Sequence, residues 1–96
     1  MPLLVNPSHP GEVLEELYLV PLGLSAIALA KRIHVPRTRI ERLVKGDTAL
    51  SADTAMRLAK LFGTTPEYWM NLQRAWDLAL ARETIDVSDI KPLAAA

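Results

Sequence analysis

The sequence predicts an all-α fold of five helices followed by a short C-terminal tail. Residues that favour a helix start recur about every ten to fifteen positions, and Pro or Gly residues that favour a helix end follow them. Between these positions, apolar residues repeat three and four places apart, as they do on one face of a helix. Strand signals are absent. The pattern therefore favours a bundle of short helices.

The composition limits the kind of protein this can be. Its 96 residues suit one domain with one core. Half of the residues are hydrophobic, yet no segment approaches the roughly 18 consecutive apolar residues of a membrane span. The absence of cysteine excludes disulfides, thiolate metal sites and cysteine nucleophiles. We expect a cytoplasmic protein whose high apolar content is partly covered in a homodimer.

The first two helices are bounded by Pro, Gly and Ser. Pro10 suits the first position of a helix, and Pro21 and Gly23 are predicted to end it. Ser25 is a natural N-cap for a second short helix, which leads to a corner at His34. The residues expected to form the apolar faces are Val13, Leu14, Leu17 and Tyr18 in the first helix and Leu29, Ala30 and Ile33 in the second.

Two further helices have equally clear limits. Pro36 opens the third helix, and Gly46 is predicted to end it as a C-cap. Ser51 caps the fourth, which Gly63 closes. The residues expected to face the core are Ile40, Leu43 and Val44 in the third helix and Ala55, Leu58, Ala59 and Phe62 in the fourth.

The fifth helix is the longest and has the widest apolar arc. It starts at residues 65–67 and is expected to reach about residue 82 or 83. One domain cannot cover such an arc, so we expect one side to pack on the domain and the other to contact a second copy. The domain side is predicted to be Tyr68, Leu72, Ala75 and Ala79, and the homodimer interface to be Trp69, Gln73, Trp76 and Leu80.

Charge is distributed unevenly along the chain. The net charge is zero, but residues 31–45 hold six of the eleven Lys and Arg residues, opposed only by Glu41. Residues 1–30 contain glutamates but neither Lys nor Arg. The basic segment covers the corner at His34 and Val35, where two short helices would meet. A basic, tightly turned helix pair predicts a helix-turn-helix that binds DNA.

The third helix carries the predicted DNA contacts. Arg37, Thr38 and Arg42 lie near its N-terminus and one turn later, where a recognition helix reaches base edges. An Arg fork can bond guanine O6 and N7, and a Thr methyl group can meet the thymine methyl group. The predicted phosphate contacts are Arg39 and Lys45 on this helix, Lys31 and Arg32 on the second, which are equally consistent with solvated charges, and Ser25 at its start.

Four motifs give the chain a family resemblance over residues 9–82. They are His9-Pro10-Gly11-Glu12, Pro21-Leu22-Gly23-Leu24-Ser25, Ser51-Ala52-Asp53-Thr54-Ala55, and Phe62-Gly63-Thr64-Thr65-Pro66-Glu67-Tyr68-Trp69-Met70-Asn71-Leu72-Gln73. Together they resemble the λ-repressor-like helix-turn-helix family and, within it, the HigA-type antitoxins, which are also called virulence-associated or plasmid-maintenance antidote proteins.

The resemblance implies a homodimeric autorepressor that binds a palindrome in its own promoter and neutralises an RNA-cleaving toxin. It assigns base reading to Arg37, Thr38 and Arg42. Two positions depart from the family pattern. His34 stands where glycine is common, and Ala26 replaces a polar residue at the start of the second helix, which removes a phosphate contact.

The toxin site has less support and rests on charge. A toxin that holds RNA must be basic, so an acidic surface would attract it without blocking the operator. The predicted surface is formed by Glu12, Glu15 and Glu16 on the first helix. We divide the chain into a mobile N-terminal segment (1–8), the helix-turn-helix domain (9–83) and an extended or loosely docked tail (84–96), in which Pro92 excludes a continuing helix.

Other interpretations remain open. The basic segment could be a solvated face of a helical module that binds only proteins, or the chain could be a transcription regulator without a toxin. No nucleophile or phosphate-binding loop accompanies the glutamates, so no catalytic residue and no enzyme activity are predicted. His9 and His34 lack metal-ligand spacing, and neither a metal nor another cofactor is expected.

Overall fold

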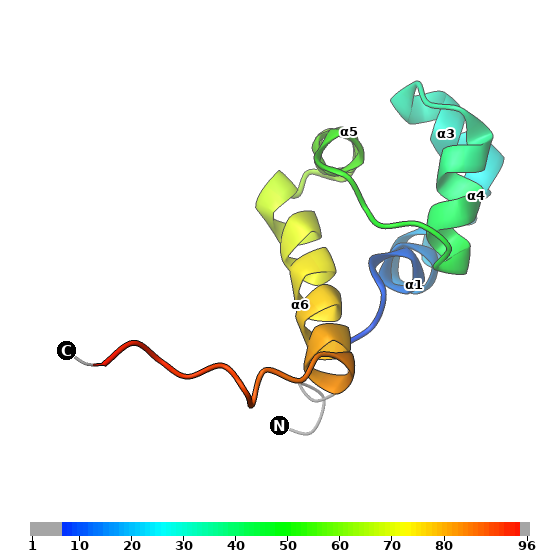
Figure 1. The fold of residues 1–96 in the computed structure, drawn as a ribbon. Coiled ribbons are helices and arrows are strands. Elements are labelled where there is room, and N and C mark those ends of the chain that lie inside the picture. Colours follow the sequence, from blue (N-terminus) through cyan, green and yellow to red (C-terminus); the bar gives the residue numbers. More distant parts are fainter. Residues whose placement is uncertain (1–6, 95–96) are drawn as a thin grey trace.

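The computed structural model describes residues 7–94, and within them every regular element is helical (Figure 1). Five helices result when the first three contiguous segments are taken as one, which confirms the predicted all-α fold. The mobile segment predicted for residues 1–8 lies largely outside the described residues. The elements are α1 (Pro10–Leu14), the π-helix η2 (Glu15–Leu19), α2 (Val20–Leu22), α3 (Ala26–Ile33), α4 (Arg37–Lys45), α5 (Ala52–Phe62) and α6 (Pro66–Thr84).

The helices form two pairs, α3 with α4 and α5 with α6. In Figure 1, α1 lies between the α3–α4 pair and α6. Helix α5 packs against both α3 and α6. The core formed between them contains fully buried leucines from α1, α3 and α5, namely Leu14, Leu29 and Leu58. Helix α4 packs against α1 and α3 through its apolar side, and its other side is open.

The first helix contains a π-helical turn that the sequence analysis did not predict. Pro21 has no N–H group for the carbonyl of Leu17 and its ring would collide with that carbonyl, which accounts for the widened turn at η2. The extra residue per turn shifts the buried face from Leu17, which is 63% exposed, to Leu19, which is 2% exposed. The prediction that Leu17 faces the core is therefore wrong. Pro21 lies within the helix, and Gly23 ends it.

The predicted helix caps are confirmed. The Ser25 hydroxyl accepts a hydrogen bond from the Ala28 N–H at 3.0 Å, and the Ser51 hydroxyl accepts one from the Thr54 N–H at 3.2 Å. At the start of α6, the Thr65 hydroxyl accepts from the N–H of Tyr68 at 3.1 Å. Each bond satisfies a donor in the first turn that has no partner within the helix. These caps fix where α3, α5 and α6 begin.

The corner between α3 and α4 is made by His34. With φ 62° and ψ 48°, it is the only non-glycine residue with positive φ in residues 7–94. The N–H of Val35 donates to the carbonyl of Ala30 at 3.0 Å, the bond that closes a Schellman turn. The chain thus adopts here the left-handed conformation that favours glycine, as its place in the motif predicts.

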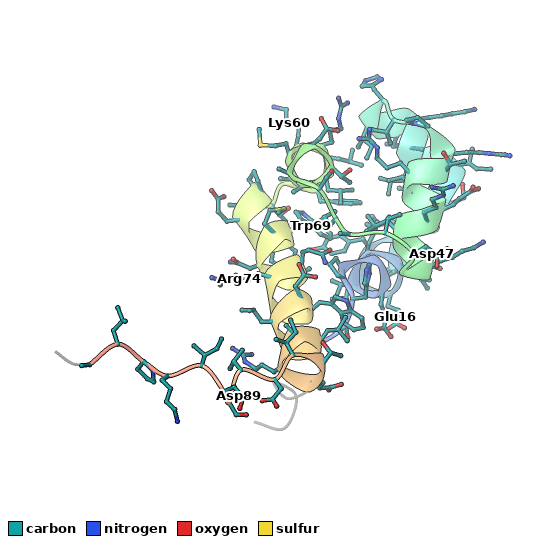
Figure 2. The ribbon with its side chains drawn as sticks, in the orientation of Figure 1. Glu16, Asp47, Lys60, Trp69, Arg74 and Asp89 are labelled. Carbon is teal, nitrogen blue, oxygen red and sulfur yellow. The ribbon has the colours of Figure 1, made fainter. Side chains whose placement is uncertain are left out.

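Two residues predicted at the dimer interface belong to the core instead. Trp69 is fully buried and points into the space between α6, α5 and α1 (Figure 2), where its ring packs 5.1 Å from that of Tyr18. Its Nε1–H donates to the Thr64 hydroxyl at 2.7 Å. Gln73 is 6% exposed, and its Oε1 accepts from the N–H of Leu50 at 2.7 Å. The helical periodicity gave the width of the apolar arc but not the side that faces the domain.

The rest of the arc on α6 is only partly covered. Trp76 is half-buried, with its ring edge-to-face at 5.3 Å from that of His9. Ala75, which was predicted to face the domain, is exposed. Leu78 and Leu80 are 45% and 50% exposed. The open apolar surface of α6 therefore lies in its C-terminal half.

No single helix in the described part of the chain is long and apolar enough to cross a membrane. The helices Pro10–Leu22 and Ala26–Ile33 reach the length and apolar content of a membrane span only when they are taken together, and the chain bends by 96° between them. Both helices contribute buried leucines to the core, which accounts for their apolar content.

Candidate nucleic-acid interface

Helix α4 has one buried and one exposed face. Ile40 and Leu43 are 0% and 2% exposed. Arg37, Thr38 and Arg42, the predicted base-reading residues, are all exposed. Thr38 and Arg42 are four residues apart and therefore share one side of the helix. The buried and the exposed face of α4 are therefore the ones that the sequence predicts.

A hollow lies beside this exposed face, between α4 and the loop that leads to α5. Thr38, Arg39 and Arg42 line it from α4, and Thr48 and Ala49 line it from the loop. Both loop residues are exposed. Neither residue is among the predicted DNA contacts, although a short polar loop directly after a recognition helix is a position from which backbone groups can reach phosphates.

Asp53 at the start of α5 connects both helices of the motif. Its Oδ2 accepts hydrogen bonds from the Nη1 of Arg39 at 2.5 Å and from the Nε of Arg57 at 3.0 Å. Arg57 also donates through Nη1 to the carbonyl of Ile33 at 2.8 Å, at the last residue of α3. This network ties α3 and α4 to α5. It was not predicted, because its members are up to 24 residues apart in the sequence.

Arg39 therefore has a partner that the sequence analysis did not foresee. The prediction gave it a phosphate contact, but the structure directs its guanidinium to Asp53. An arginine held in this way fixes the orientation of α4. We assign it a positioning role, and its phosphate contact stays a prediction, because only Nη1 is bonded to Asp53 and the side chain is 41% exposed.

The same network makes stability depend on pH. Hydrogen bonds from Arg39 and Arg57 hold the pKa of Asp53 below its usual value of 3.8. A carboxylate with a lowered pKa stabilises the fold above the ordinary carboxyl pKa, and this contribution is lost as the pH falls through the lowered value. We expect Asp53→Asn to lower the stability to urea at pH 7. Between pH 5 and 3 the variant should lose less stability than the wild type does, because it has no carboxylate to protonate at this position. Asp47→Asn, on the exposed loop after α4, is the control, and equal pH profiles for all three proteins would contradict the assignment.

A close backbone contact sets the position of α4 against α1. A Cβ atom built on Gly11 would lie 1.7 Å from the carbonyl oxygen of Leu43. Only glycine permits this approach. The Nδ1 of His9 accepts a hydrogen bond from the Gly11 N–H at 2.9 Å and so caps α1 next to the contact. The His-Pro-Gly motif therefore places the recognition helix.

The remaining predicted phosphate contacts are exposed. Ser25, Lys31 and Arg32 all face solvent. Ser25 uses its oxygen as a cap acceptor, which leaves its O–H free to donate. Arg32 lines a second hollow together with His34 and Lys60, a lysine that was not predicted. The basic surface thus continues from the corner of the motif onto α5.

Lys45 lies at the border between two surfaces of opposite charge. It is exposed at the end of α4, on the same side of the helix as Thr38 and Arg42. It also lines a hollow whose other wall carries Glu12, Glu15 and Glu16. The structure therefore brings the three predicted toxin-contact glutamates together, and they adjoin the end of the recognition helix.

Comparisons with known proteins place this geometry in context. The profile of the helix-turn-helix family matches residues 14–69. Virulence-associated protein I from Dichelobacter nodosus is 49% identical over 75 residues, which cover 78% of this chain and 69% of that protein.

Solved structures agree over most of the chain. An addiction module antidote protein of the HigA family from Coxiella burnetii is 46% identical, with a TM-score of 0.77 over 81% of this chain and 85% of that one. The antitoxin GraA in complex with its operator is 36% identical, with a TM-score of 0.87 over 94% of each chain.

Proposed function

We propose a function from the premise that this chain belongs to the helix-turn-helix family and, within it, to the HigA-type antitoxins. The protein is a sequence-specific DNA-binding antitoxin that represses its own operon as a dimer and neutralises an RNA-cleaving toxin. The observation that carries the DNA-binding part is the exposed, cationic side of α4 beside the hollow lined by Thr38 and Arg42. The similarity of this chain to an antitoxin solved in complex with its operator also supports DNA binding.

Each residue of this surface has a proposed role on DNA. Helix α4 enters the major groove, so that Arg37 and Thr38 at its start and Arg42 one turn later reach base edges. The network around Asp53 and the close contact at Gly11 hold the helix at a fixed angle. Phosphates on either side are contacted by Ser25, Lys31, Arg32 and Lys45, with Thr48 and Lys60 as additional candidates.

Footprinting of the DNA upstream of the gene tests this function. A two-fold dimer places two copies of α4 in successive major grooves, about 34 Å and 10 base pairs apart, or in a multiple of that spacing. We expect a protected inverted repeat with this separation between its half-sites. A protected region without two-fold symmetry, or no protection at all, would count against an operator-binding dimer.

The toxin surface that we propose is the outer side of the first helix. It combines the carboxylates of Glu12, Glu15 and Glu16 with apolar side chains that the π-helical turn leaves in solvent: Leu17 and Val20 are 63% and 65% exposed. A basic partner would be attracted by the charges and anchored by the apolar residues. The glutamates line one hollow together with Lys45 at the end of α4, so the proposed toxin surface adjoins the DNA surface there, while Figure 2 places Glu16 far from Lys60 on α5.

Charge reversal tests the toxin surface. We expect Glu15→Lys with Glu16→Lys to reduce capture of the co-expressed product of the neighbouring gene by about tenfold or more, while operator binding is kept, because two attractive charges become repulsive. The control is Glu67→Lys with Asn71→Lys, which adds positive charge to an exposed part of α6. Undiminished capture by the first variant would remove the glutamates from the site. If the wild type captures no partner, the alternative of a stand-alone cytoplasmic regulator is favoured.

A further inference from the structure

The C-terminal tail does not pack on its own domain. After Thr84 the backbone becomes extended at Ile85 and leads away from the helices (Figure 1). The radius of gyration is 16.3 Å, whereas a compact chain of this length has about 12–13 Å. The large apolar side chains of the tail are all in solvent: Ile85 is 62%, Val87 58%, Ile90 72% and Leu93 95% exposed.

A groove of matching character lies on the C-terminal half of α6. It is lined by Pro7, Trp76, Ala79 and Leu80, and Glu83 contributes a carboxylate. Leu80, which is 50% exposed, is the open apolar side chain of this groove. The chain thus exposes an apolar strip and an apolar groove, neither of which it covers itself.

We propose that the tail of one copy lies in this groove of a second copy, so that two exchanged tails complete the homodimer. The proposal deepens the proposed function, because it rests on the dimer that binds the operator. One charge pair fits this placement, although Asp86 and Asp89 make the tail net negative. Lys91 is the only cation in the tail, Glu83 is the only charged residue of the groove, and neither makes an ion pair within residues 7–94.

The dimensions allow the exchange. Residues 85–94 in extended form span up to about 33 Å, and the 19 residues of α6 are about 28 Å long. The tail can therefore reach along the whole exposed half of a partner's helix. A two-fold axis between the C-terminal ends of two α6 helices makes both contacts equivalent, as a closed dimer requires.

Removal of one apolar side chain tests the burial. In the full-length chain, we expect Ile90→Ser to raise the dimer dissociation constant by about tenfold or more, because one apolar anchor is lost in each of two tails. Met56→Ser is the matched control, since Met56 is 60% exposed on α5. Sedimentation equilibrium without DNA or toxin gives the constants, so the result does not depend on the proposed function. Equal constants for Ile90→Ser and the wild type would overturn the proposal.

Mixing two charge variants tests whether the contact is between chains. Lys91→Glu and Glu83→Lys should each dimerise more weakly than the wild type, because each places like charges together. Their equimolar mixture should dimerise about three- to tenfold more tightly than either alone, because the heterodimer contains two opposite pairs. A tail that folds back on its own domain gives no gain on mixing. That result, or tails whose mutation impairs only toxin capture, would contradict the exchange.

Discussion

Gly11→Ala should destabilise the fold by about 3 kcal/mol or more and abolish operator binding at 37 °C. The added methyl group would overlap the carbonyl oxygen of Leu43, at 1.7 Å. A backbone carbonyl cannot turn aside as a side chain does, so α1 and α4 must separate. For a domain of this size, each kcal/mol lowers the melting temperature by about 4–8 °C, so we expect a fall of about 12 °C or more.

Gly23→Ala distinguishes this overlap from a general effect of losing glycine. Gly23 has φ +63°, and a Cβ atom there would meet nothing within 4 Å. The variant should therefore lose only about 1 kcal/mol, the cost of a left-handed conformation. Thermal denaturation of the two variants gives the comparison. Equal losses would show that α1 and α4 adjust freely, and the account of how α4 is placed would be wrong.

Arg42→Ala should weaken operator binding by about 1–3 kcal/mol in each half-site. A dimer loses the contact twice, which corresponds to about thirtyfold to about 20,000-fold in affinity. Arg42 is exposed over the hollow beside α4 and makes no side-chain hydrogen bond or ion pair in residues 7–94, so its fork is free to bond a guanine. Binding to unrelated DNA should change much less.

Lys45→Ala provides the comparison for Arg42→Ala. As a phosphate contact at the end of α4, it should weaken binding to all sequences alike and lower the salt slope by about one per site. Titrations of both variants on operator and random DNA at several salt concentrations separate the roles. The division between base and phosphate contacts fails if the two variants behave alike on both DNAs.

The parts of the fold predictable from sequence are those set by local chemistry. Ser25, Ser51 and Thr65 cap helices because their hydroxyls bond the first turn, whatever the rest of the chain does. The split of α4 into a buried and an exposed face follows from its periodicity, which also gave Arg37, Thr38 and Arg42 as exposed residues. The helix bounds and the candidate base contacts needed no tertiary information.

The remaining features depend on packing between distant segments. The periodicity of α6 could not show that Trp69 and Gln73 face the domain, because both sides of the helix are apolar. The pairing of Arg39 with Asp53 joins two helices whose relative placement only the fold supplies. The π-helical turn is the exception, because it has a local cause in Pro21, a residue that the sequence pattern predicts to end the helix.

The most direct test of the account is the affinity of the wild-type protein for two DNA duplexes of equal length and composition. One contains the inverted repeat found by footprinting, and the other has the same bases in shuffled order. Fluorescence anisotropy titrations at about 0.15 M salt should give an affinity about a thousandfold or more higher for the repeat, with both affinities falling as salt rises. Equal affinities at every salt concentration would contradict the account, because the cations of α4 would then form a charged surface that reads no sequence.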